Sequence, residues 1–168
     1  MTKMVAHHVP TDPALLAAVG EVAIRHEHLN HILRMTIKSL ANVPVEVAQA
    51  ATKYDGSRQL RDRARKLARK MLVEGPPLMQ LQAILAHCER LSELRNELVH
   101  GLWAEDHPNA EGTAHVRNAF GQSRPIPTLE ELNSLARQLE ALSSSLNHAR
   151  LYGWLKDAIE DRARSLGK

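Results

Sequence analysis

Leucine and alanine recur at helical spacing through most of this 168-residue chain, and this periodicity restricts the fold more than any other feature of the sequence. From Leu15 to Leu40 the apolar residues keep that spacing without a break. Aromatic residues make up only 3% of the chain, so the residue types that favour β-strands are scarce. The sequence therefore predicts an all-α fold.

Helix start and stop signals divide the chain into four main helices. Asp12 is a candidate cap for the first helix, Ser57 for the second, and Thr128 begins a capping box for the last. The expected helices cover about 13–41, 57–74, 78–100 and 129 onward with a break near 152–153, and a short connecting helix covers about 45–52. Gly101 is expected as the glycine that follows the third long helix. Short connections between such helices predict an antiparallel bundle of four to five helices.

The segment between the last two long helices has no helical period. Turn residues gather at 108–109 and 111–112, which interrupts any regular element there. The residues 102–104 and 114–117 on either side can pair as two short strands. We therefore expect a small β-hairpin inserted into an otherwise helical protein.

Length and composition predict one domain over residues 1–168. The single cysteine, Cys88, cannot form an intramolecular disulfide, which is typical of a reducing compartment. The N-terminus lacks the apolar core of a signal peptide, and no apolar run is long enough to cross a bilayer. A cytoplasmic protein without membrane association is expected.

A short polar stretch at the end of the third long helix carries the main functional signal. Its residues are Arg95-Asn96-Glu97-Leu98-Val99-His100, followed by Gly101. This stretch resembles the R-x4-6-H motif of the HEPN superfamily (higher eukaryotes and prokaryotes nucleotide-binding), in which a polar residue often follows the arginine. In that family the motif ends an interior helix of a small helical bundle, which is the placement expected here.

The resemblance implies a metal-independent endoribonuclease of the toxin or antiviral-defence type that needs no cofactor. It also implies a homodimer in which paired motifs face each other, with an antitoxin or a nucleotidyltransferase as a further protein partner. His100 is the candidate base, because imidazole changes its charge near neutral pH. Arg95 would stabilise charge in the transition state, and Asn96 would orient the imidazole or a phosphate oxygen.

Helical geometry raises a question about how the two motif residues meet. On an ideal helix Arg95 and His100 are separated by about 140°, so their side chains diverge. Either a partner chain or a frayed last turn must bring an arginine to a histidine, and we expect a composite site at a dimer interface. A structural alternative has Arg95 paired with a neighbouring glutamate while His100 faces the helix dipole.

The second long helix is rich in cations. Its candidate RNA-binding residues are Arg58, Arg61, Arg65 and Arg69. Several cations on one helix can neutralise successive phosphates, although a solvated helix face has the same composition. The helix has no aromatic residue to stack a base, which argues against sequence-specific reading of single strands there.

The first helix contains His26-Glu27-His28-Leu29-Asn30-His31, which superficially resembles a metal site. The second histidine of the zinc protease motif falls four positions after the first, whereas His31 is five positions after His26, so no metal site is expected. HEPN-like proteins often carry an acidic residue in this helix. By that resemblance Glu27 is a candidate partner of Arg95, and an ordinary surface glutamate is the alternative.

Two functional hypotheses follow from the sequence. The first is a homodimeric HEPN-like domain that binds RNA and cleaves it. The second is a non-catalytic helical adaptor, for example the partner of a nucleotidyltransferase, whose basic helix is merely solvated.

Overall fold

The computed structural model describes residues 5–7, 9–106, 114–118 and 121–167, and these residues are mostly helical. The helices are α1 (Pro13–Ala41), α2 (Val45–Thr52), α3 (Ser57–Met71), α4 (Pro76–Val99), α5 (Leu129–Tyr152) and α6 (Trp154–Ser165). The strands are β1 (Val5–His7), β2 (Leu102–Asp106), β3 (His115–Arg117) and β4 (Ser123–Pro125).

The caps of the long helices follow from local sequence. The Asp12 carboxylate accepts the Ala14 N–H at 2.9 Å, and Pro13 occupies the first turn of α1. At α5 the Thr128 hydroxyl accepts the Glu131 N–H while the Glu131 carboxylate accepts the Thr128 N–H, which completes the predicted capping box. The predicted break near 152–153 is confirmed, because α5 ends at Tyr152 and α6 begins after Gly153.

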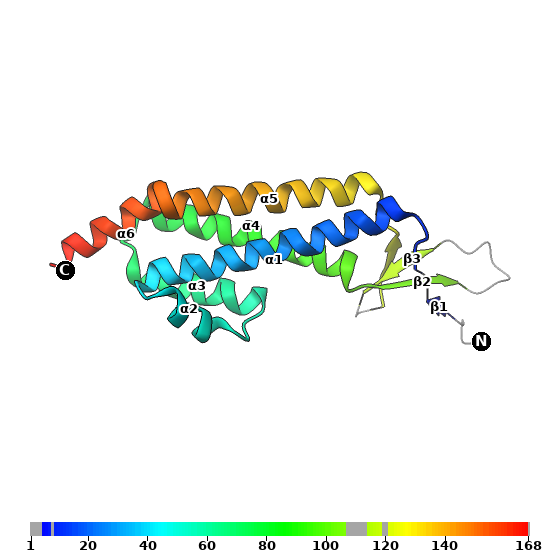
Figure 1. The fold of residues 1–168 in the computed structure, drawn as a ribbon, viewed down its shortest axis with the longest axis horizontal. Coiled ribbons are helices and arrows are strands. Elements are labelled where there is room, and N and C mark those ends of the chain that lie inside the picture. Colours follow the sequence, from blue (N-terminus) through cyan, green and yellow to red (C-terminus); the bar gives the residue numbers. More distant parts are fainter. Residues whose placement is uncertain (1–4, 8, 107–113, 119–120, 168) are drawn as a thin grey trace.

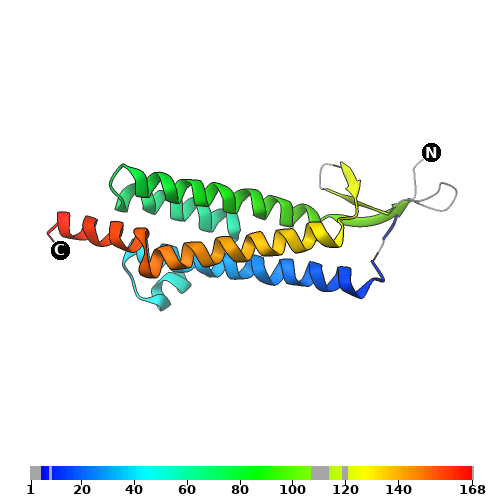
Figure 2. The ribbon, with the colours of Figure 1, turned by 90° about the horizontal axis from the view of Figure 1, so that it is seen from above.

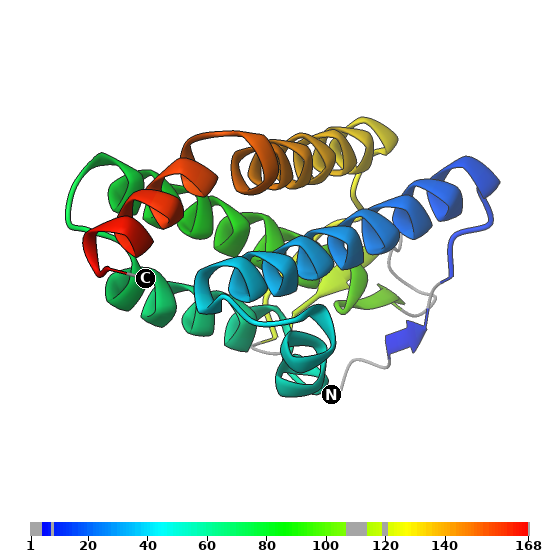
Figure 3. The same ribbon diagram turned by 60° about the vertical axis from the view of Figure 1, so that its left-hand side comes forward.

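The long helices form an elongated bundle in which α1 and α5 lie side by side and run in the same direction (Figures 1 and 2). An ion pair of 3.0 Å between Arg25 and Glu140 joins the two helices near their midpoints. The short α2 folds back and packs against α1 (Figure 3). The chain then continues into α3, which also packs against α1. The simple antiparallel order that short connections suggested is therefore wrong for the pair α1 and α5, whereas α3 and α4 do run in opposite directions.

One hydrophobic cluster, made mainly of leucine and alanine, joins α1, α3, α4, α5 and α6. Its fully buried members include Leu29, Leu33, Leu60, Leu81, Leu85, Leu98, Leu132, Leu135, Leu139, Leu146 and Leu155. These residues occupy the apolar positions of the predicted helical periods, so the periodicity correctly identified the buried faces. No helix among the described residues is both long and apolar enough to cross a membrane.

A small antiparallel sheet lies at the end of the bundle where α4 ends and α5 begins, opposite α6 (Figure 1). The strand order is β1-β2-β3-β4. Strands β2 and β3 pair as the predicted hairpin, with Leu102 opposite Arg117 and Ala104 opposite His115. Strands β1 and β4 were not predicted, because three residues are too few to show a period. The turn residues expected at 108–109 and 111–112 lie outside the described residues.

Gly101 connects α4 to the sheet, and its role differs from the one expected. Its φ is not in the left-handed region; instead, a Cβ at this position would overlap Val116 Cγ1 and lie 2.5 Å from the Glu97 carbonyl oxygen. The residue is glycine because β3 passes directly over it. Arg124 of β4 holds the sheet to the helices through Glu97 at 3.6 Å and Glu131 at 3.3 Å.

Candidate active site

Arg95 and His100 meet within one chain at the end of α4. The helix ends at Val99, and His100 leaves it with φ −101° and ψ −3°. This turn brings His100 Nε2 to 2.5 Å from Arg95 Nη1. The two motif residues therefore meet without a second chain, although the His100 N–H still donates to the Asn96 carbonyl as in a helix. The composite site at a dimer interface stays a prediction.

The contact requires one particular tautomer of His100. A guanidinium is always charged and can only donate, so His100 Nε2 accepts with its lone pair. This hydrogen bond therefore requires the His100 tautomer that has its proton on Nδ1. His100 is exposed and Arg95 is half-buried, so the pair lies where a ligand can approach it.

Asn96 orients the arginine. Its side-chain oxygen accepts a hydrogen bond of 3.1 Å from Arg95 Nη1, and its backbone carbonyl accepts the His100 N–H at 3.0 Å. Of the two predicted partners of the Asn96 amide, the imidazole is replaced by Arg95, and a phosphate oxygen stays a prediction. Glu97 pairs with Arg124, so the structural alternative in which Glu97 neutralises Arg95 does not apply.

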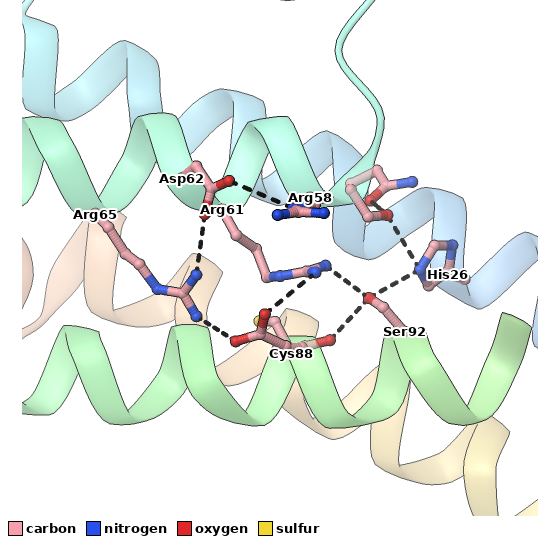
Figure 4. A network of polar contacts seen from close by, with 10 residues as sticks. His26, Arg58, Arg61, Asp62, Arg65, Cys88 and Ser92 are labelled. Carbon is pink, nitrogen blue, oxygen red and sulfur yellow. Dashed lines mark hydrogen bonds and ion pairs between the residues drawn. The ribbon is translucent and has the colours of Figure 1, made fainter.

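A buried polar network joins α1, α3 and α4 (Figure 4), and its His26 lies close enough to Arg95 and His100 for them to affect its pKa. His26 Nε2 is 3.1 Å from the Ser92 hydroxyl and 3.2 Å from the Ser57 hydroxyl. Ser57 donates to Asn30 at 2.5 Å, and Asn30 donates to Glu27 at 3.0 Å. Ser57 was expected to cap α3, but Gly56 occupies the cap position, which leaves the Ser57 hydroxyl free to turn inward.

His26 is only 3% exposed, and its surroundings oppose protonation. Burial is the largest cause that lowers its pKa, from 6.5 to about 4, and the positive charge of Arg95 is the next. Arg61 and His100 lower the pKa further, while Glu27 opposes them. His26 is therefore neutral near pH 7, and it lies close enough to Arg95 to feel its charge.

Arg61 belongs to this buried network, which contradicts its predicted role in RNA binding. Its side chain is 6% exposed, and Nη1 donates to the Ser92 hydroxyl at 3.1 Å. Nη2 lies 3.9 Å from the Glu89 carboxylate (Figure 4). The sequence did not predict this, because arginines are mostly exposed and nothing in the charge pattern of α3 distinguishes a buried one.

The other cations of α3 divide into two groups. Arg65 donates to Glu89 at 2.6 Å and to Asp62 at 3.2 Å, so carboxylates already neutralise it. Arg58 is exposed and lies 3.9 Å from Asp62. Lys66, Arg69 and Lys70 are exposed and border an open depression together with Asp62 and Arg65. The cationic surface is thus centred on Lys66, Arg69 and Lys70, and two of these were not among the predicted residues.

Glu27 lies near the site but touches His26 and Asn30 instead of Arg95. Its Oε1 is 4.0 Å from His26 Nδ1, and its side chain is mostly exposed. Sequence reasoning missed His26, Ser57 and Ser92 as site residues. The histidine-rich segment of α1 was the available signal, although its spacing indicated only that a metal site was not expected.

Metal and thiol chemistry find little support in the described part of the chain. No group of three or more His, Cys, Asp or Glu side chains is placed there to hold a metal ion. Cys88 is fully buried, and burial raises the pKa of its thiol to about 12. A thiolate nucleophile at this position is therefore excluded near neutral pH.

Comparison with known proteins adds no relative. No family model matches the chain, and neither the curated proteins nor the solved structures contain a significant match.

Proposed function

We propose that this protein is a HEPN-like, metal-independent endoribonuclease whose active site is formed by Arg95, Asn96 and His100. The observation that supports this best is the contact of 2.5 Å between Arg95 Nη1 and Nε2 of the exposed His100 at a helix end. An imidazole can act as the base and a guanidinium can stabilise negative charge, and these are the two roles needed when RNA is cleaved by its own 2′-hydroxyl.

The proposed reaction begins when a phosphate of RNA approaches the pair. A phosphate oxygen is a stronger acceptor for a guanidinium than a neutral imidazole is, so Arg95 transfers its hydrogen bond from His100 to the phosphate. The freed Nε2 of His100 then takes the proton of the ribose 2′-hydroxyl. The 2′-oxygen attacks phosphorus, and the bond from phosphorus to the 5′-oxygen breaks.

Arg95 stabilises the extra negative charge on the phosphate oxygens during this step, and Asn96 keeps the guanidinium in place. The departing 5′-oxygen takes up the proton that His100 received. The products are a 2′,3′-cyclic phosphate and a 5′-hydroxyl, and His100 returns to its neutral form.

RNA binding is proposed on the exposed face of α3 around Lys66, Arg69 and Lys70, with Arg58 at the start of the helix. Arg58 forms only a long, exposed ion pair with Asp62 at 3.9 Å, and the three other cations border an open depression, so phosphates can replace their counterions. We further propose a homodimer with an antitoxin or nucleotidyltransferase partner, as the family resemblance implies.

A non-catalytic adaptor is the second candidate, and one observation favours it. In the free protein Arg95 occupies the lone pair of His100 that a base must use. If no phosphate displaces Arg95, the pair is only a helix-terminating contact. Cleavage measurements separate the two candidates.

The test uses single-stranded RNA of mixed sequence, the same sequence as DNA, and EDTA in every reaction. We expect the RNA alone to be cut, with a 2′,3′-cyclic phosphate end. Arg95→Gln and His100→Gln should each lower kcat/KM by about a hundredfold or more. Arg90→Gln, an exposed arginine on the same helix, and His28→Gln, an exposed histidine on α1, are matched controls that should retain activity. Cleavage that survives His100→Gln, or that needs a divalent metal, would refute the proposed site.

A further inference from the structure

The hydrogen bonds around His26 assign its tautomer. The Ser92 hydroxyl donates to the Cys88 carbonyl at 2.8 Å, and the Ser57 hydroxyl donates to Asn30 Oδ1 at 2.5 Å. Each hydroxyl has one proton, so neither can donate to His26 as well. His26 Nε2 must therefore carry the proton and donate to both oxygens, and Nδ1 carries the lone pair (Figure 4).

The Nδ1 atom of His26 is a buried acceptor with no hydrogen-bond partner among the described residues. The nearest charged oxygen, Glu27 Oε1, lies at 4.0 Å and is itself an acceptor. Glu27 therefore cannot satisfy Nδ1, and its own Oε1 already accepts from Asn30. A buried acceptor left unpaired costs about 1–3 kcal/mol, so a donor close by should pair with it.

Arg95 carries a buried donor in the same situation. Its Nη1 donates to His100 and Asn96, but its Nε–H is buried and unpaired within the described part of the chain. Arg95 is one helical turn from Ser92, which His26 already contacts, so both side chains lie on the face of α4 that packs against α1. The unpaired acceptor, His26 Nδ1, and the unpaired donor, the Arg95 Nε–H, thus belong to neighbouring side chains.

We propose that His26 is a positioning residue for Arg95: its Nδ1 accepts the Arg95 Nε–H after a small side-chain rotation and holds the guanidinium against His100. The Nε–H points away from the Nη1 group, so the bond to His26 leaves the contact with His100 intact. The contact itself needs no RNA. Its consequence for cleavage rests on the proposed function, because a fixed guanidinium stabilises a transition state better than a mobile one.

The first measurement is the ¹⁵N spectrum of the imidazole rings in the wild-type protein at pH 7. We expect His26 to be neutral, with its proton on Nε2 and an Nδ1 signal shifted as for a hydrogen-bond acceptor. A proton on Nδ1, or a charged ring, overturns the proposal. This measurement requires neither a variant nor an active enzyme.

The second measurement is the exchange rate of the Arg95 Nε–H with solvent in three variants. His26→Gln keeps an amide donor for Ser92 and Ser57 but removes the acceptor at the Nδ1 position, and exchange should accelerate about three- to tenfold, as expected when one hydrogen bond is removed. His26→Asn places its side-chain oxygen near the Nδ1 position and should restore slow exchange. The control Ser92→Ala disturbs the network on the Nε2 side only and should leave the exchange rate close to that of the wild type.

Equal exchange rates of the Arg95 Nε–H in the wild type and in His26→Gln overturn the proposal. An equally large acceleration in Ser92→Ala also overturns it, because it would indicate that any change in the network loosens Arg95. If His26→Gln does not fold, as judged by circular dichroism, the proposal is tested by the tautomer of His26 in the wild type and by the exchange rate of the Arg95 Nε–H in His26→Asn. RNA cleavage is measured separately. A wild-type protein that shows the contact but cuts no RNA refutes the proposed function and leaves the positioning role intact, whereas an active enzyme without the contact refutes only the positioning role.

Discussion

Arg95 Nη1 donates to His100 Nε2 within a single chain, so an arginine proton occupies the lone pair that a base would use. His100 is the C-cap of α4, and its N–H still donates to the Asn96 carbonyl at 3.0 Å. A continuous helix would point the two side chains in different directions. The contact at the end of α4 therefore brings both motif residues together within one chain.

Activity is predicted to depend on both motif residues of the same chain. In the proposed homodimer, mixing Arg95→Ala and His100→Ala subunits should restore no activity, because every site then lacks one residue. A heterodimer of wild type with the Arg95→Ala/His100→Ala double variant should keep about half of the wild-type activity, from its one complete site. The measurement is RNA cleavage by heterodimers isolated with two different tags. Recovery in the first mixture would show a composite site after all.

Gly101→Ala is predicted to destabilise the fold and to disturb the motif. The added methyl group overlaps Val116 and the Glu97 carbonyl, and overpacking of this kind costs about 1–3 kcal/mol. Gly20→Ala is the matched control, because a Cβ there meets nothing within 4 Å and lies on the surface of α1. It should stabilise the protein by roughly 0.5–1 kcal/mol. Urea unfolding measures both, and equal effects would contradict the close approach of β3 to α4.

The buried, neutral His26 predicts that the protein loses stability in mild acid. Its folded pKa of about 4 is below the unfolded value near 6.5, so the unfolded chain binds more protons between these two pH values. The stabilisation is fully present above pH 6.5 and is lost as the pH falls toward 4. Between pH 7 and pH 5 the loss attributable to this residue should be about 2 kcal/mol.

The measurement is the free energy of unfolding of the wild type and of His26→Gln at pH 7 and pH 5. The variant has no titrating group at this position, so its stability should fall less over this range. The charged and titratable groups that face His26 are Arg61, Arg95, His100 and Glu27, and the variant retains all of them. Equal losses in both proteins would show that His26 does not titrate with a lowered pKa.

Substitution of two arginines of α3 is predicted to affect different properties, stability for Arg61 and RNA binding for Arg69. Arg61→Ala should cost about 1.5–3 kcal/mol, because the buried Ser92 hydroxyl loses a charged hydrogen-bond donor, whereas Glu89 keeps Arg65 as its partner. Arg69→Ala should change stability by less than about 0.5 kcal/mol but weaken RNA binding. It should also reduce the dependence of log K on log salt by about 0.7 for each phosphate that the variant no longer neutralises. Binding to single-stranded RNA at several salt concentrations measures this, and an unchanged slope would assign the exposed face of α3 to solvent.

The sequence by itself determined the helices and the motif. The bounds of α1 and the start of α5 follow from local caps, which act within a few residues of the chain, and the buried leucines follow from the helical period. The hairpin of β2 and β3 was also predicted from the two short segments around the turn-rich stretch. The motif could be found because its residues are contiguous.

Tertiary structure decided what the contiguous residues face. Arg61 and Arg69 are equivalent in the sequence, yet packing of α3 against α4 buries the first beside Ser92 and leaves the second in solvent. His26 is near Arg95 only because α1 packs against α4, which joins residues far apart along the chain. Likewise position 101 has no room for a side chain because β3 passes over it, and the residues next to Gly101 in the sequence do not predict this contact. Local sequence thus selected the elements, whereas contacts between distant segments determined the protonation, burial and partners of the side chains at the site.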